Sequence, residues 1–378
     1  MIVQTPPMGW NTWNTFGRDI HEQLVRECAD ALVERGFRDA GYRYCIVDDC
    51  WSEKSRDPVT DRIVTDRQKF PSGMKALGDY IHQKGLRFGM YSCAGVRTCE
   101  DYPGSFGHEF LDAQMFAEYG CDYLKYDFCK RPCVSDGPQL YRIMGQALRS
   151  TGRDILFAAC NWGSDDVWSW IRTTGASTYR STADIIDTFE SFRSIAESQL
   201  DKQAFNANNC FNDLDMLTVG MNGKGLVALE KGGCTAEEYQ MQFLLWCILG
   251  SPLILGCDVR TVDDTTVALL TNPELIRINQ DPQCCQTYCL NTTYHKDRYI
   301  LVRLLSDGDM AIGYFNFSDE SRILPLYFSD LGFPVYCGKK FCFTDLLTGE
   351  EQWIAGDYFN RAMQPKQSIL YRVHVAER

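Results

Sequence analysis

Short apolar runs, rich in β-branched and aromatic residues, recur along roughly the first 280 residues, and a polar or acidic residue follows most of them. Runs of this length between turn signals are typical of buried strands. They occupy residues 8–13, 42–47, 86–92, 123–126, 154–160, 178–183, 210–217 and 251–257. The pattern therefore predicts eight strands in this part of the chain.

Apolar residues at helical spacing fill several of the intervals. One such stretch covers residues 21–36 and ends at Gly36, and two more stop at Gly85 and Gly120, where glycine suits the residue that closes a helix. A fourth opens at Thr235, a favourable N-cap. Alternating strands and helices indicate parallel β/α units, and eight units predict an α/β fold of the (β/α)8 (TIM) barrel type. A doubly wound sheet is the alternative, but no glycine-rich phosphate loop follows the first strand.

The sequence pattern changes at about residue 290, where short runs of alternating apolar and polar residues begin. Turn signals such as SDGD and LTGE separate these runs, as in an antiparallel sheet. We expect a catalytic barrel over residues 1–287 and a C-terminal antiparallel β-sandwich over residues 288–378. No low-complexity linker lies between them, so the two domains should pack directly.

The net charge and the hydropathy of the chain exclude some classes of binding partner. The chain of 378 residues has a formal net charge of -12, so no basic patch can dominate, which argues against nucleic acid or an anionic membrane. The opening MIVQTPPMGW lacks the features of a secretory signal, and no apolar stretch reaches the roughly 18 residues that span a bilayer. We therefore expect a soluble cytoplasmic protein. Assembly into a homo-oligomer stays open.

Candidate chemistry gathers where the predicted strands end, which in a (β/α)8 barrel is the face that carries the active site. A single acidic residue at a strand end is more often the N-cap of the next helix. The coincidence of many such residues at one mouth indicates a site. The residues are Asp48, Asp49, Asp127, Asn161, Trp162, Asp184 and Asp215, with Lys125 and Arg180 inside the strands.

The types of residue present favour glycoside hydrolysis, which needs two carboxyl groups beside the scissile bond. The five histidines form no HxH or HExxH pair, the 18 cysteines lack zinc spacing, and no GxSxG occurs. We therefore expect no metal and no cofactor, and a serine hydrolase is disfavoured. Lys125 shares a strand face with Asp127. It either forms a structural ion pair or keeps a catalytic carboxylate charged.

Longer motifs carry a further signal. They are PPMGWNTWN, VDDCW, DRQKFPSGMKALGDYIHQKGLRFGMYS, TCEDYPGS, DAQMFAEYGCDYLKYDFC, YRSTADIIDTF, NDLDML and INQDP. In this order they strongly resemble glycoside hydrolase family 27 of clan D, which holds α-galactosidases and α-N-acetylgalactosaminidases. The resemblance runs from about residue 5 to residue 285, and the β domain after it fits the layout of the family.

The resemblance implies a role for each candidate. Asp127 becomes the nucleophile and Asp184 the acid/base, with the α configuration retained and the two carboxyl groups about 5–5.5 Å apart. Lys125 should keep Asp127 ionised, and the pKa of Asp184 should be raised. Sugar-binding roles are implied for Trp10 on the sugar face, Asp48 and Asp49 at O6 and O4, Tyr91 and Trp162 lining the pocket, and Lys125, Asn161, Arg180 and Asp215. A disulfide between Cys99 and Cys129 is implied beside the nucleophile.

Three departures from the family pattern bear on specificity. Asn161 stands where many α-galactosidases have a glutamate that contacts O2, and it can still hydrogen-bond that hydroxyl. Gly163 and Ser164 are small, as in relatives that admit an acetamide group. Phe211 replaces a tryptophan, which we interpret as packing. Asp48 favours a substrate with a C6 hydroxyl, since relatives that cleave β-L-arabinopyranosides tend to lose this acid.

We therefore expect a retaining exo-acting α-galactosidase with a small carbohydrate as its substrate. The alternatives are an α-N-acetylgalactosaminidase or an enzyme of relaxed specificity, then a β-L-arabinopyranosidase or a sugar-binding protein without turnover. A metal- or phosphate-dependent barrel enzyme has no support in the sequence.

Overall fold

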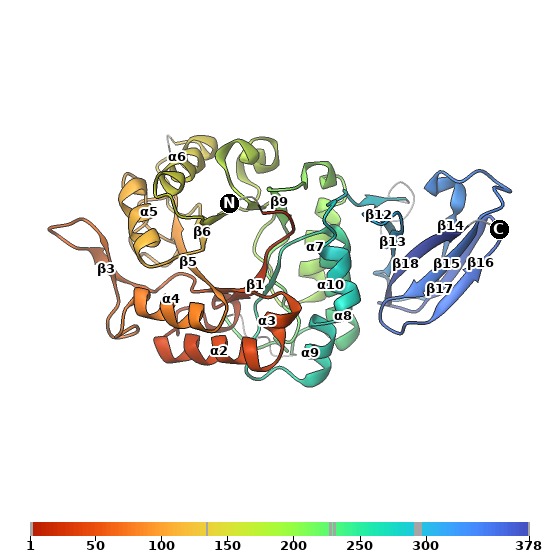
Figure 1. Cartoon of the computed structure of the whole chain (residues 1–378), viewed down its shortest axis with the longest axis horizontal. Coiled ribbons are helices and arrows are strands. Elements are labelled where there is room, and N and C mark those ends of the chain that lie inside the picture. Colours follow the sequence, from red (N-terminus) through yellow and green to blue (C-terminus); the bar gives the residue numbers. More distant parts are fainter. Residues whose placement is uncertain (1–2, 134, 227–228, 230–231, 291–296, 377–378) are drawn as a thin grey trace.

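The computed structural model describes residues 3–133, 135–226, 229, 232–290 and 297–376. Figure 1 shows a barrel of strands surrounded by helices at one end and a smaller all-β unit, drawn in blue, at the other. The helices α8 (Ala236–Leu249) and α10 (Pro273–Asn279) lie on the side of the barrel that faces the blue unit.

The eight predicted strands all form and make one parallel sheet. In spatial order it runs β10, β1, β2, β5, β6, β7, β8, β9. A parallel bridge between Leu217 and Leu255 joins the end of the β9 segment to β10 and closes the barrel. The strand bounds are β1 Met8–Asn11, β2 Tyr44–Ile46, β5 Arg87–Cys93, β6 Tyr123–Asp127, β7 Leu156–Cys160, β8 Thr178–Arg180, β9 Phe211–Asp213 and β10 Leu253–Leu255.

The four predicted helices are present, with the expected ends. Gly36 takes a φ of 80° after α2. At the start of α8 the Glu238 amide donates to Thr235 Oγ1 and the Glu238 carboxylate accepts from the Thr235 amide, which forms a capping box. The predicted helices are α2 Glu22–Glu34, α4 Met74–Gln83, α5 Glu109–Glu118 and α8. The structure adds α1 Trp13–Phe16, α3 Phe37–Ala40, α6 Gly137–Ser150, α7 Phe189–Gln199, α9 Asp264–Leu270 and α10.

Two connections depart from a simple β/α repeat. A hairpin of β3 (Ser52–Arg56) and β4 (Ile63–Thr65) follows β2 and projects from the barrel at the left edge of Figure 1. The segment after β7 forms short 3-10 turns, η1 (Ser164–Ser169) and η2 (Ile171–Thr174), in place of an α-helix. A third such turn, η3 (Gln203–Phe205), precedes β9.

The C-terminal strands form the expected antiparallel sandwich. A six-stranded sheet in the order β11, β12, β13, β18, β15, β16 packs against the two-stranded sheet β14–β17 around a core that includes Ile312, Leu324, Phe343 and Phe359. The strands are β11 Tyr288–Cys289, β12 Arg298–Leu304, β13 Met310–Asn316, β14 Arg322–Tyr327, β15 Lys340–Asp345, β16 Glu351–Ile354, β17 Tyr358–Met363 and β18 Ser368–Ala376, with a 3-10 turn η4 at Phe328–Leu331. Helix α8 contacts β12, β13 and β18, so barrel and sandwich pack directly. The domain boundary after residue 287 stays a prediction.

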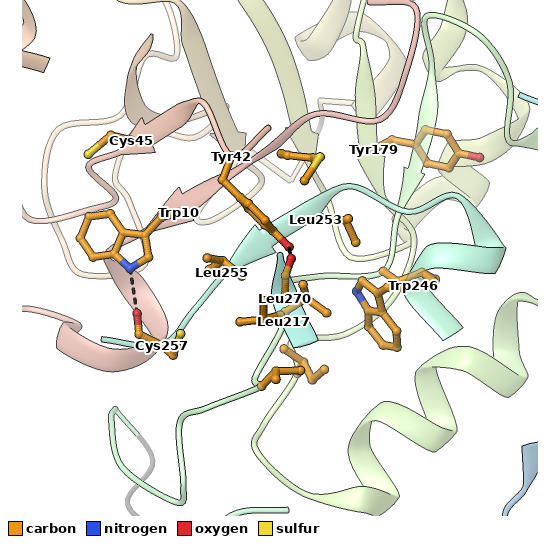
Figure 2. Close-up of a cluster of buried hydrophobic side chains, with 14 of the residues drawn as sticks. Trp10, Tyr42, Cys45, Tyr179, Leu217, Trp246, Leu253, Leu255, Cys257 and Leu270 are labelled. Carbon is orange, nitrogen blue, oxygen red and sulfur yellow. Dashed lines mark hydrogen bonds between the residues drawn. The ribbon is translucent and has the colours of Figure 1, made fainter. Parts of the chain in front are cut away.

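The main core lies between the barrel wall and its helices. Figure 2 shows Trp10, Tyr42 and Trp246 in this layer, where Trp10 Nε1 donates to the Cys257 carbonyl at 2.8 Å and Tyr42 Oη donates to the Leu270 carbonyl at 2.8 Å. The buried polar atoms of Trp10 and Tyr42 thus each have a hydrogen-bond partner. Among the described helices, none has the length and apolar character that crossing a bilayer demands.

Candidate active site

A pocket of about 220 Å³ opens at the carboxyl ends of the barrel strands. In a (β/α)8 barrel this is the catalytic face, because the loops after the strands converge there. Most of the predicted site residues line this pocket together, although they come from distant parts of the chain. They are Asp48, Asp49, Tyr91, Lys125, Asp127, Trp162, Arg180, Asp184 and Asp215.

Asp127 lies at the floor of the pocket, at the end of β6. Its Oδ2 accepts a hydrogen bond from Tyr91 Oη at 2.9 Å, and its Oδ1 accepts one from the Phe128 amide at 2.9 Å. Burial raises the pKa of Asp127 to about 6, although Lys125 and these hydrogen bonds act in the opposite direction. Lys125 thus favours the ionised form of Asp127, as expected, but desolvation has the larger effect. At neutral pH the carboxylate is still mostly ionised and can act as a nucleophile.

Lys125 pairs with Asp48 rather than with its strand neighbour Asp127. Its Nζ lies 2.8 Å from Asp48 Oδ2, and Asn11 Nδ2 donates to the same oxygen at 2.7 Å. Burial alone would lower the pKa of Lys125, but the Asp48 carboxylate holds it well above its usual value. Asn11 was missed by sequence analysis. It fixes the Asp48 carboxylate from below the pocket.

Asp184 lies at the open side of the pocket. Its side chain is 71% exposed, and Arg180 Nη2 lies 3.0 Å from its Oδ1. The same guanidinium reaches the carbonyl oxygens of Thr182 and Ala183 at 3.1 and 3.0 Å. Arg180 therefore fixes both the acid/base candidate and the loop that carries it.

Asp215 connects these groups. Its Oδ1 lies 2.9 Å from Arg180 Nη1, and its Oδ2 accepts a hydrogen bond at 2.8 Å from the amide of Ile185, the residue after Asp184. Asp215 itself has a φ of 76°, an uncommon conformation for a residue with a side chain. Trp246 Nε1 donates to its carbonyl oxygen and Asp213 Oδ1 accepts from its amide, which holds the strained backbone. This arrangement makes Asp215 a positioning residue for Asp184.

A second, smaller cavity of about 20 Å³ lies deeper in the barrel and shares Lys125, Arg180 and Asp215 with the pocket. Asp213 lines it, and burial raises the pKa of Asp213 to about 6. Burial also raises the pKa of Asp49, in the pocket above, to about 6. Several carboxyl groups at the floor of the site therefore have raised pKa values and ionise only at a higher pH than usual.

Trp10 is one predicted residue that the structure places outside the pocket. Its side chain is fully buried in the core between the barrel and its helices (Figure 2). The reason is strand alternation: Asn11 points into the barrel, so Trp10 points outward. The next tryptophan, Trp13, lies beyond the strand and lines the pocket. The alternation of side-chain direction along the MGWN strand was the sequence signal that could have identified Trp13, rather than Trp10, as a pocket residue.

Asn161 is the second predicted residue that does not line the pocket. It is fully buried, and its Nδ2 donates to the Ser164 carbonyl at 3.0 Å. Cys160 lines the pocket instead, with its Sγ 3.8 Å from Arg180 Nη1. Neither Gly163 nor Ser164 lines the pocket. Gly163 has a φ of 86°, and a Cβ there would approach the Ser181 carbonyl to 2.6 Å, so its small size serves the backbone.

The implied disulfide is present close to Asp127. Cys99 and Cys129 are bonded, with their Cα atoms 5.3 Å apart, and Cys129 Sγ lies 4.0 Å from Tyr91 Oη. Among the described residues, these two sulfurs and Asp127 form the one cluster of possible metal ligands. Because the sulfurs are joined to each other, they offer no thiolate to a metal. Phe211, the remaining departure, is buried in β9.

Comparison with known proteins identifies the family of the chain. The family model described as alpha galactosidase A (Melibiase_2) matches residues 5–281. An α-galactosidase of Cyamopsis tetragonoloba is 44% identical over 332 residues, which cover 88% of this chain and 77% of that protein. The crystal structure of α-galactosidase I from Mortierella vinacea has a TM-score of 0.90 and 31% identity, and the match covers 98% of this chain and 97% of that one.

A structure of α-galactosidase from Saccharomyces cerevisiae with raffinose has a TM-score of 0.88 and 27% identity, covering 99% of this chain and 98% of the other. The sequence match and the shared fold both extend over most of the chain. All of the motifs that carry the resemblance, except INQDP, contribute residues to one pocket. The chain therefore belongs to the α-galactosidase A (melibiase) family, glycoside hydrolase family 27.

Proposed function

We propose that this protein is an exo-acting, retaining α-galactosidase that removes terminal α-linked galactose from short oligosaccharides. The observation that carries the proposal is one pocket with a buried carboxyl group, Asp127, at its floor and an exposed one, Asp184, at its mouth. A volume of about 220 Å³ is below the roughly 300–1,000 Å³ of drug-sized sites, which suits a single sugar ring at a chain end.

The different environments of Asp127 and Asp184 support a double-displacement mechanism. Asp127 attacks the anomeric carbon as the bond to the leaving oxygen breaks, and Asp184 gives its proton to that oxygen. Asp184 then takes a proton from water, whose oxygen attacks the anomeric carbon and releases Asp127. Two inversions leave the α configuration unchanged. The carboxyl separation of about 5–5.5 Å that retention requires stays a prediction.

The remaining polar groups support binding of a galactose ring. Lys125 and Asp48 form a paired cation and anion beside Asp127, and each can still exchange hydrogen bonds with hydroxyl groups. Asp48 and Asp49 line the pocket as the proposed partners of O6 and O4. The relative from Saccharomyces cerevisiae was solved with raffinose, and we extend this class of galactosyl oligosaccharide to the present chain.

The alternative specificity for N-acetylgalactosamine has little support. It depended on Gly163 and Ser164 making room for an acetamide, yet neither residue lines the pocket, and Gly163 is explained by its backbone. We therefore place α-galactoside ahead of the N-acetyl sugar and of β-L-arabinopyranoside.

Two measurements test the proposal. Initial rates on nitrophenyl α-galactoside, α-N-acetylgalactosaminide and β-L-arabinopyranoside should rank the α-galactoside first by at least about tenfold in kcat/KM. Proton NMR of the first product should show α-galactose before mutarotation. Dominant turnover of another sugar would overturn the specificity, and β-galactose as first product would overturn the mechanism.

A further inference from the structure

The mouth of the pocket is apolar, in contrast to its charged floor. Beyond Asp184 the wall is formed by Ile185, Ile186, Met221 and Leu226. Ile186 and Leu226 are 41% and 51% exposed, although neighbouring large apolar side chains of the barrel are buried. Exposed apolar side chains that are continuous with a catalytic pocket indicate a surface that is covered when a ligand binds.

The position of Ile186 relates this surface to the leaving group. A general acid must lie within hydrogen-bond reach of the oxygen that it protonates. Ile185 and Ile186 follow Asp184 directly, and the amide of Ile185 is fixed by its hydrogen bond to Asp215 Oδ2 at 2.8 Å. A group attached to the oxygen that Asp184 protonates therefore lies near this part of the wall.

Leu226 reaches the same opening from another loop and is held there. Its amide donates to the Asn14 carbonyl at 2.8 Å. A Cβ on Gly17 would come within 2.6 Å of Leu226 Cδ1, so the leucine side chain packs closely on the Gly17 backbone. An anchored but half-exposed leucine offers a preformed apolar contact rather than a mobile one.

We propose that Ile186 and Leu226 form an apolar subsite for the leaving group, which accepts the C–H face of a six-membered ring. The ring is either the next sugar of an oligosaccharide or an aryl aglycone, and both present the same chemistry to the two side chains. This proposal rests on the proposed function, because the reaction defines the leaving group. It predicts that the enzyme selects substrates by the group attached to galactose as well as by galactose itself.

Substrates with and without a ring in the leaving group test the subsite. α-Galactosyl fluoride fills only the sugar pocket, nitrophenyl α-galactoside adds an aryl ring, and melibiose adds a glucose ring. We expect Ile186→Ser and Leu226→Ser each to lower kcat/KM about fivefold on the two ring-bearing substrates, as apolar contact area is lost. Turnover of the fluoride should stay unchanged.

Matched variants separate this role from a structural one. Val96 is 53% exposed on a loop that follows β5 and does not line the pocket, so Val96→Ser should leave all three rates unchanged. Ile186→Val, which keeps an apolar surface, should retain most of the activity on the ring-bearing substrates. Thermal unfolding of each variant verifies that the fold is intact.

Each outcome is decisive. Loss on the aryl or the sugar glycoside with unchanged fluoride hydrolysis supports the subsite and assigns its occupant. Equal loss on the fluoride, or no loss on either ring-bearing substrate, overturns it while the proposed function stands. If the wild type hydrolyses none of the three substrates, the proposed function is wrong and the subsite falls with it.

Discussion

The floor and the rim of the pocket each hold one carboxyl group of the proposed catalytic pair, in opposite environments. Asp127, on the floor, is 6% exposed and is fixed by strand β6, Tyr91 and the Phe128 amide. Asp184, at the rim, has a side chain that is 71% exposed and is fixed by Arg180. A nucleophile must be placed rigidly against the anomeric carbon, whereas the acid/base must exchange protons with the leaving group and then with water.

The buried carboxyl groups at the floor of the pocket reduce the stability of the fold when they ionise. Burial raises the pKa values of Asp49, Asp127 and Asp213 from 3.8 to about 6. The folded chain thus binds these protons more tightly than the unfolded chain does. Ionising the groups lowers the free energy of unfolding as the pH rises from about 4 to about 6, and the loss persists above that range. A site tuned for function is often a strained part of the fold in this sense.

The largest effect should come from the floor nucleophile. Asp127→Asn keeps the size of the side chain but removes the attacking oxygen, so kcat/KM should fall by roughly 10⁴-fold or more on every α-galactoside. Steady-state rates on nitrophenyl α-galactoside measure this. Activity within tenfold of the wild type would show that another residue is the nucleophile.

The rim acid/base should give a loss that depends on the leaving group. Asp184→Asn should lower kcat about 10²–10⁴-fold on melibiose, whose leaving oxygen needs a proton. Galactosyl fluoride needs far less protonation, so the first step on this substrate should be largely spared. A loss of equal size on both substrates would contradict the division of roles between floor and rim.

Asp215 connects the floor of the pocket to its rim, and its replacement should lower kcat by an intermediate factor. Asp215→Asn weakens the contacts to Arg180 and to the Ile185 amide, and a small displacement of Asp184 can cost up to about 10²-fold. We expect kcat to fall about 10–100-fold while the fold persists. Asp281→Asn is the matched control, because Asp281 is also buried but binds the Ser306 amide and hydroxyl away from the pocket. Equal effects of the two variants would argue for a purely structural Asp215.

The pH dependence of kcat/KM should reflect the ionisation of the carboxyl groups at the floor of the pocket rather than at its rim. Asp127 attacks only when ionised, and Asp49 beside it also has a pKa of about 6. kcat/KM on galactosyl fluoride should therefore fall below pH 6, to about one tenth of its plateau at pH 5. The apparent pKa belongs to both groups together. An acid limb below about pH 4 would show that burial is weaker than the structure indicates.

The disulfide should have the smallest effect on rate. It joins exposed Cys99 at the rim to buried Cys129 beside Asp127. Replacing both cysteines by serine should cost about 2–4 kcal/mol of stability. The loss of kcat should be only a few-fold, because β6 still positions Asp127. Chemical denaturation and rates at 25 °C measure the two effects, and a rate loss as large as that of Asp215→Asn would place the bond within the catalytic framework.

Periodicity was sufficient to predict the frame. Eight apolar runs became eight parallel strands, because strands buried on both faces must be apolar along their whole length. Polar residues just after such strands meet at one edge by geometry, which is why Asp127, Asp184 and Asp215 could be grouped from sequence alone. The 3-10 turns after β7 and six of the helices were not located from the sequence, namely α1, α3, α6, α7, α9 and α10.

Side-chain direction was harder to predict near strand ends. Trp10 and Asn161 belong to the expected motifs but point away from the pocket, while Trp13 and Cys160 point into it. A shift of one residue reverses the face that a strand residue occupies. Residues with a left-handed backbone, such as Trp162 with a φ of 55°, change the direction of the following side chains. The sequence gives no clear signal of where such residues occur.

By itself the sequence determined the barrel, the order of its strands and the carboxyl groups at its mouth, because these depend on local pattern and on strand geometry. Only the tertiary structure decided that Lys125 pairs with Asp48, that Asp215 ties Arg180 to the loop of Asp184, and that burial raises the pKa of Asp127. Each of these depends on contacts between segments far apart in the chain. Desolvation and pairing arise only when the folded chain brings such segments together.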